Sequence, residues 1–123
     1  MGKITLMKQT LADALGKLVG HELSSVTFVR DYVQLAFDGP GMNAYTMPTV
    51  ACGSESLGLG QPGYRDGLCR QIGCKVERTE VDAQRVSIVF EGGAAISISL
   101  RDEDYRGPEA LEFSLDDKCI WVV

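Results

Sequence analysis

The apolar residues of this chain follow two periods, one after the other. Near the start they recur every three or four residues, which places them on one face of a helix: Met7, Leu11, Ala14, Leu15 and Leu18. Gly20 comes next and can end the helix in the left-handed conformation. The pattern then alternates, with Val33, Leu35 and Phe37 on one side of a strand. The sequence therefore predicts a helix followed by strands that have one buried face.

The same order of patterns returns 53 positions later. A helical face, a glycine and an alternating strand follow one another in Tyr64, Leu68, Ile72, Gly73, Val86, Ile88 and Phe90. Shifting the chain against itself by 53 positions, without a gap, aligns Asp13 with Asp66, Leu15 with Leu68, Gly20 with Gly73, Val33 with Val86, Phe37 with Phe90 and Gly39 with Gly92. Chance rarely aligns both an apolar pattern and its glycines. We therefore predict an internal repeat of residues 10–47 and 63–100.

Each copy is predicted to be a helix followed by a three-stranded antiparallel meander. The strands cover residues 23–29, 32–37 and 42–47, and then 76–81, 85–90 and 94–100. Asp38-Gly39 and Glu91-Gly92 follow the middle strands, where a glycine permits a tight hairpin. The apolar anchors of each first strand lie an odd number of residues apart, so we expect a bulge or a bend there. The ungapped alignment also matches Tyr45 with Ile98 and Met47 with Leu100.

The rest of the chain completes the predicted fold. Residues 48–62, rich in glycine and serine, are expected to form a linker loop. Residues 108–123 end in an apolar run that we expect to pair as an extra strand. One helix and one meander cannot cover both of their apolar faces, but two such units can cover each other. We predict one α+β domain, residues 1–123, in which two pseudo-symmetric units of a helix and a three-stranded antiparallel meander form one sheet or a partly closed barrel.

Composition fits a soluble globular domain and narrows the class of partner. The 123 residues are 45% hydrophobic and 24% charged, close to the globular average. The net charge of −5 repels nucleic acid and anionic membranes, and it favours a basic protein. No apolar run reaches the roughly 18 residues of a membrane span, and residues 1–5 lack a secretory apolar stretch. We expect a cytoplasmic protein.

The cysteines and glycines carry no motif for a metal, a redox reaction or a nucleotide. Cys52, Cys69, Cys74 and Cys119 match neither zinc-pair nor CxxC spacing, so we expect reduced thiols, mostly in the core. The Gly58–Gly63 stretch has the glycines of a dinucleotide fingerprint, but that fingerprint needs a parallel strand-helix-strand unit. No cofactor, metal or catalytic residue is predicted.

Two groups of residues are candidates for a binding site. His21 and its repeat equivalent Cys74 could meet between the two units, together with Tyr45 and Tyr64, and line a ligand pocket. The simpler interpretation is that His21 caps helix carbonyls and Cys74 fills a gap. The acidic residues Asp102, Glu103, Asp104 and Glu109 could hold a basic partner, or could simply belong to a solvated loop.

A resemblance adds one further expectation. The string Val33-x-Leu35-x-Phe37-Asp38-Gly39, with its echo Val86-x-Ile88-x-Phe90-Glu91-Gly92, resembles small bacterial proteins of unknown function in which a Phe-Asp-Gly meander recurs. Some of these are encoded beside toxin systems, which implies an immunity-like role. No catalytic residues come with the resemblance.

The leading hypothesis for function is a non-enzymatic binding module of unknown specificity whose acidity favours a basic protein partner, with immunity-like inhibition as its most specific form. The alternative is a small-ligand binder or an enzyme with a pocket between the two units. A homodimer through edge strands is a third possibility.

Overall fold

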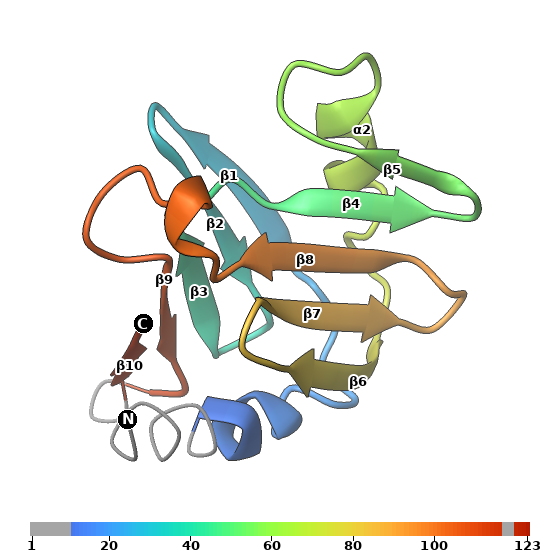
Figure 1. Cartoon of the computed structure of the whole chain (residues 1–123). Helices are drawn as coiled ribbons and strands as arrows, with labels where there is room; N and C mark the ends of the chain where they lie inside the picture. The colour runs from blue at the N-terminus through green and yellow to red at the C-terminus, as the bar shows by residue number, and fades with distance from the viewer. Residues whose placement is uncertain (1–10, 117–119) are drawn as a thin grey trace.

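The computed structural model describes residues 11–116 and 120–123 of the chain. Within these ranges ten strands form two five-stranded sheets, and hydrogen-bonded neighbours are antiparallel (Figure 1). The prediction of an α+β protein built mainly from antiparallel strands is confirmed. The alternative of one continuous sheet is wrong, because the strands divide into two separately hydrogen-bonded sets.

Each sheet combines a predicted meander with a hairpin. The first has the order β1-β2-β3-β9-β10 and the second the order β5-β4-β8-β7-β6. The strands of the first sheet are β1 (Ser25–Val29), β2 (Tyr32–Ala36), β3 (Gly41–Ala44), β9 (Leu111–Ser114) and β10 (Ile120–Val122). The strands of the second sheet are β4 (Thr49–Cys52), β5 (Glu55–Leu57), β6 (Val76–Val81), β7 (Arg85–Phe90) and β8 (Ala95–Ser99).

The hairpins are exchanged between the two halves of the chain. The β4–β5 hairpin follows the first meander in sequence, yet β4 pairs with β8 of the second meander. The β9–β10 hairpin follows the second meander, yet β9 pairs with β3 of the first. Each sheet therefore depends on strands from both halves.

Two segments fold differently from the sequence-based prediction. Residues 48–62 contain β4 and β5 rather than a loop throughout, and residues 108–123 contain two strands rather than one. Val50 on β4 and Phe113 on β9 are both fully buried. The physical reason is that the edge of each meander offers unpaired backbone donors and acceptors, so a short segment can form a strand there without strong periodicity of its own.

The described residues include two α-helical segments. Residues 11–16 are helical, and the predicted start of this helix near Met7 or Thr10 lies outside the described residues. Helix α2 (Tyr64–Cys69) packs against β4. A Cβ atom on Gly67 would lie only 3.0 Å from Cγ1 of Val50, so glycine allows this close approach.

Backbone hydrogen bonds join the two halves reciprocally just after the helices. The N–H of Gly20 donates to the carbonyl of Val76 at 2.9 Å, and the N–H of Gly73 donates to that of Leu23 at 2.8 Å. Between them, Glu22 and Lys75 form an isolated antiparallel bridge. These contacts obey the 53-residue offset of the sequence repeat: Gly73 is the repeat equivalent of Gly20, and Leu23 is that of Val76. Glu22 and Lys75 are likewise equivalent to each other.

The predicted bulge is present in β6, where the register with β7 shifts between Val76 and Arg78. In the first meander the N–H of Ser24 donates to the carbonyl of Ala36, while Ser25 is the residue paired with Ala36. Two residues thus oppose one, which is the pattern of a bulge. The expectation is confirmed for β6, and β1 itself pairs with β2 without a register shift from Ser25 to Val29.

The ungapped alignment of the two repeats fails after the turn that joins the middle strand of each meander to its last strand. Val33 pairs with Ala44 in the first meander, whereas its equivalent Val86 pairs with Ile98 in the second. Ile98 therefore corresponds to Ala44 and not to Tyr45. The turn between β7 and β8 contains one residue more than the turn between β2 and β3, and its Gly92 and Gly93 both have positive φ. A one-residue insertion in a turn leaves the strands unaltered and shifts only the numbering.

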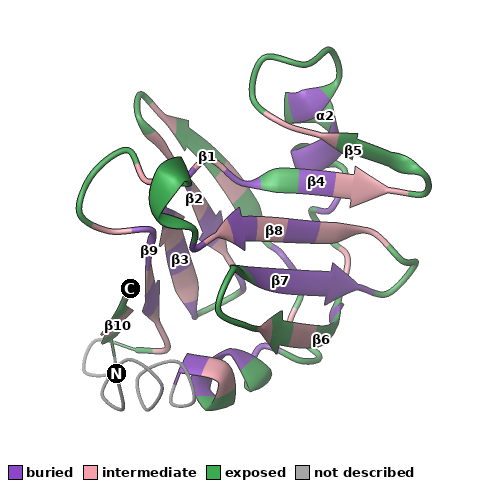
Figure 2. Cartoon of the chain, in the orientation of Figure 1, coloured by how far each residue is buried: buried purple, intermediate pink, exposed green. Residues whose placement is uncertain are grey.

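The core lies where the inner sides of the two sheets meet the helices. Phe37, Phe90 and Phe113 are the largest fully buried side chains, and Leu11, Leu15 and Leu18 are buried with them. Figure 2 shows buried and more exposed residues alternating along β2 and β8. The alternating pattern that predicted these strands is thus the pattern of contact with the core.

Candidate functional site

His21 and Cys74 lie on either side of the Glu22–Lys75 bridge and act there through their backbones. The carbonyl of His21 accepts from the N–H of Val76, and that of Cys74 accepts from the N–H of Leu23. The His21 N–H also donates to the Leu18 carbonyl at 2.8 Å. Neither residue lines the two cavities described below.

Tyr64 is a buried structural residue. Its hydroxyl donates a hydrogen bond of 2.5 Å to the backbone carbonyl of Pro48, at the entry to β4. Burial raises the pKa of Tyr64 to about 12. Tyr64 and Tyr45 line different cavities, so the four predicted pocket residues do not form one pocket.

Tyr45 instead belongs to a small cavity of about 190 Å³, which we call the aromatic hollow. Its lining residues are Asp31, Tyr32, Tyr45, Arg106, Gly107, Pro108 and Glu109. The rings of Tyr32 and Tyr45 lie 5.3 Å apart, in a tilted arrangement typical of paired aromatic rings. The structure thus brings together Tyr45 and Glu109, two residues that the sequence suggested for separate sites.

Two carboxylates lie close to the Tyr45 hydroxyl. The Tyr45 hydroxyl donates to Oε1 of Glu112 at 3.1 Å. Burial is the main cause that raises the pKa of Tyr45; the Asn43 hydrogen bond, the next largest effect, lowers it, and the carboxylates of Glu112 and Glu109 raise it through individually smaller effects. Since both carboxylates disfavour a second negative charge, the Tyr45 side of the hollow favours a cation over an anion, whereas Arg106 adds a positive charge to the lining.

The acidic turn, residues Asp102–Asp104, is a short 3-10 helix (η1), and all three of its residues are exposed. Two of its three carboxylates have partners in the protein. Glu103 pairs with Arg101, and Oδ2 of Asp104 accepts from the Ser99 hydroxyl at 2.6 Å. The predicted partner residues therefore divide between the outer side of the second sheet, where Asp104 contacts Ser99, and the aromatic hollow, which Glu109 lines.

A larger cavity of about 530 Å³, the outer groove, lies on the face of the second sheet that points away from the core. Ser97 and Ser99 alternate along β8 with the buried Ile96 and Ile98, which places the serines on the outer side. The groove is lined by Thr46, Met47, Thr49, Leu59, Asp82, Gln84, Arg85, Ser97, Ser99, Arg101, Asp104 and Arg106.

The sequence-based predictions did not include the outer groove. Its three arginines come from β7, from the start of η1 and from the loop after it. The alternation of serine with isoleucine in β8 was the only local signal of a polar outer face.

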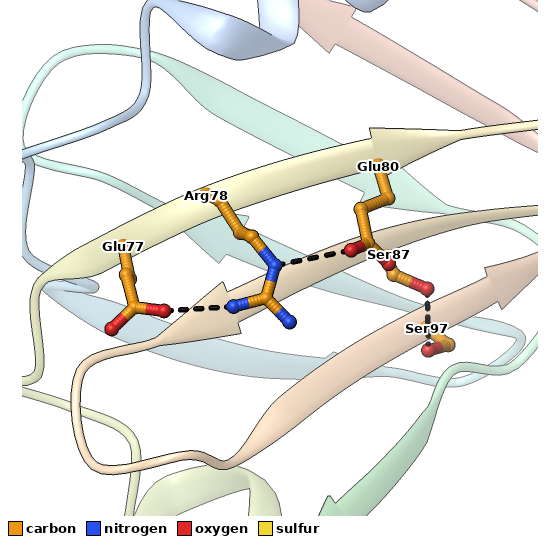
Figure 3. A network of polar contacts seen from close by, with 5 residues as sticks. All are labelled: Glu77, Arg78, Glu80, Ser87 and Ser97. Carbon is orange, nitrogen blue, oxygen red and sulfur yellow. Dashed lines mark hydrogen bonds and ion pairs between the residues drawn. The ribbon is translucent and has the colours of Figure 1, made fainter.

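The arginines on this side of the second sheet differ in how they are neutralised. Figure 3 shows Arg78 of the edge strand β6 between Glu77 and Glu80, and the hydroxyls of Ser87 and Ser97 facing each other on β7 and β8. Arg85 and Arg106, by contrast, form no ion pair with any residue that the structure describes. Charged side chains on an edge strand such as β6 also oppose pairing with another chain.

The described ranges contain no cluster of three or more metal-ligating side chains. Cys52 and Cys74 are free thiols, partly buried and packed against the core, whereas Cys69 is free and exposed. Cys119 lies outside the described residues. None of the helices described has the length and apolar character needed to cross a membrane.

Comparison of the chain with protein-family models, with curated proteins and with solved structures found no match.

Proposed function

We propose that this protein is a cytoplasmic, non-enzymatic binding module that recognises a basic protein, with immunity-like inhibition as its specific form. The observation that carries the proposal is the aromatic hollow, where two tyrosine rings and the carboxylates of Asp31 and Glu109 line one small cavity. The acidic turn extends the negative surface beyond it.

The aromatic hollow has the chemistry that recognises a lysine or arginine side chain. A cation over an aromatic face gains about 0.5 to 2 kcal/mol, and a carboxylate nearby adds a charge-assisted hydrogen bond. The net charge of −5 attracts a basic partner from a distance. The hollow is small enough to accept one side chain of a protein and too small for most metabolites.

We further propose that the two halves of the chain are related by an approximate twofold axis through the Glu22–Lys75 bridge. The reciprocal hydrogen bonds of Gly20 and Gly73 support this relation, since in a twofold contact each residue pair occurs twice with its members exchanged. The hollow is lined from the β1–β2 turn, from Tyr45 before β4 and from the segment before β9, and none of its lining residues belongs to the Glu22–Lys75 bridge.

The test uses a charge reversal at the hollow and a matched one elsewhere. Protein with Glu109→Lys is compared with wild type and with Glu91→Lys, which makes the same charge change in the exposed turn after β7. Each is immobilised and exposed to native lysate at low salt, and the retained partner is then purified and titrated. We expect Glu109→Lys to weaken binding by at least about tenfold, as for loss of a charge-assisted contact, and Glu91→Lys by less than about twofold.

Two results would refute the proposed function. One is the absence of any stoichiometric partner of wild type at low salt, where electrostatic attraction is least screened. The other is equal weakening by both variants, because that would leave only non-specific attraction by the net charge.

A further inference from the structure

The outer groove has the size and the lining of a site for a small organic molecule. Its volume of about 530 Å³ lies within the roughly 300 to 1,000 Å³ of most ligand sites. The hydroxyl-bearing residues Thr49, Ser97 and Ser99 line it from β4 and β8, where the two halves of the chain pair. The groove is therefore built on paired strands and not on a loop alone.

The charge of the groove is opposite in sign to that of the chain. Three arginines, Arg85, Arg101 and Arg106, face two aspartates, Asp82 and Asp104, in a protein of net charge −5. Arg101 is paired with Glu103, which does not line the groove. Arg85 and Arg106 have no ion pair within the described part of the chain. A guanidinium group without a carboxylate is able to bind an anion through two parallel hydrogen bonds.

Both carboxylates of the groove already accept hydrogen bonds from the protein. Oδ1 of Asp82 accepts from the backbone N–H groups of Gln84 and Arg85, at 2.7 and 2.9 Å. Oδ2 of Asp104 accepts from the Ser99 hydroxyl at 2.6 Å. These bonds hold the carboxylates toward the backbone and the strand, so they position the groove walls.

An apolar wall completes the groove. Met47 and Leu59 line it, and Leu59 is 57% exposed, the largest exposed fraction among the bulky apolar residues described. A groove lined by an exposed apolar side chain and by two guanidinium groups without an ion pair among the described residues is suited to a ligand that has both an apolar body and an anionic group.

We propose that the outer groove binds a small organic anion, a phosphate or carboxylate carried on an apolar body. Arg85 and Arg106 bind the anionic group, and Met47 and Leu59 contact the body. This site is distinct from the hollow that anchors the basic partner, although Arg106 lines both. Arg85 lines only the outer groove of the two, so it allows the anion site to be tested separately.

The experiment measures binding of defined probes to the full chain by calorimetry and by chemical-shift mapping. Phenyl phosphate and benzoate distinguish a phosphate from a carboxylate ligand. Inorganic phosphate tests the anionic group alone, and benzyl alcohol tests the apolar body alone. We expect one of the two aromatic anions to bind more tightly than inorganic phosphate, with shifts at the amides of Ser97 and Ser99, and benzyl alcohol to produce none.

The variants are Arg85→Gln and a matched control, Arg30→Gln, which removes the same charge from the exposed turn between β1 and β2. We expect Arg85→Gln to weaken binding of the aromatic anion by about tenfold or more, the usual loss for a charge-assisted pair, and Arg30→Gln by less than about twofold. If Arg85→Gln does not fold, Arg106→Gln in the exposed loop replaces it. The proposal is overturned if no probe binds at about 10 mM, if benzyl alcohol binds as well as the anions, or if the control weakens binding equally.

Discussion

At the scale of single residues, buried polar side chains connect segments that are remote in sequence. The Thr46 hydroxyl donates to the backbone carbonyl of Ser99 at 2.8 Å, and the Tyr64 hydroxyl donates to that of Pro48. In the described residues every buried side-chain nitrogen or oxygen has a hydrogen-bond partner. Because an unsatisfied buried group costs about 1 to 3 kcal/mol, these contacts select the observed arrangement over others of similar apolar burial.

The stability that the Tyr64–Pro48 hydrogen bond contributes depends on pH. The pKa of Tyr64 is raised from 10.0 to about 12 in the folded protein, so its contribution to stability is complete below about pH 10 and is lost as the pH rises through about 12. We expect Tyr64→Phe to be less stable than wild type at neutral pH, by about 1 to 3 kcal/mol, because the Pro48 carbonyl loses its donor. The difference should shrink as the pH rises from about 10 to 12.

Urea unfolding of both proteins at several pH values measures this difference, and the other tyrosines, common to both, cancel in the comparison. A difference in unfolding free energy that stays constant from neutral pH to about pH 12 would contradict the assignment.

At the scale of elements, the turn that ends each helix also connects the halves. Gly20 and Gly73 have φ of +89° and +91°, and each donates its N–H to the other half. A Cβ atom on either would meet nothing within 4 Å, so space is not the reason for glycine. The left-handed backbone is the reason, because an L-residue is strained in that conformation.

Alanine substitutions test this explanation. Gly20→Ala and Gly73→Ala should each destabilise the protein by about 1 to 2 kcal/mol, the cost of a left-handed non-glycine residue. Gly107→Ala is the control, since a Cβ there also meets nothing but φ is not positive. It should be neutral or stabilise by up to about 1 kcal/mol. Thermal or urea unfolding checks all three, and an equal effect at the three positions would refute the conformational explanation.

At the scale of the whole molecule, the exchanged hairpins make the halves interdependent. Without β4 and β5 the second sheet loses its partner at β8, and without β9 and β10 the first loses its partner at β3. A three-stranded meander with an uncovered apolar face is marginally stable by itself. The folded unit is therefore the pair of halves.

Splitting the chain tests this interdependence. Cut in the turn after β5, fragments 1–59 and 60–123 should each be unfolded and should regain a sheet signal and a cooperative melt when mixed. The matched cut before β4 gives fragment 48–123, which keeps all five strands of the second sheet and should retain more structure than 60–123. Circular dichroism of the separate and mixed fragments measures both. A cooperative melt of 60–123 alone would contradict the account.

The sequence by itself determined the local elements and much of the core. Alternation at Val33, Phe37, Val86 and Phe90 predicted strands whose inner residues are fully buried, and the glycines after the helices have the expected positive φ. These features follow from the sequence because periodicity and backbone conformation are properties of neighbouring residues.

Only the tertiary structure decided which strands pair and which side chains meet. The residues around β4 and β9 carry weak periodicity, and their partners β8 and β3 lie far away in the chain or belong to the other half. Tyr45 and Glu109 come together because β9 pairs with β3, and the arginines of the outer groove converge from three separate segments. Such long-range contacts depend on how the two apolar faces cover each other, and no local pattern encodes that choice.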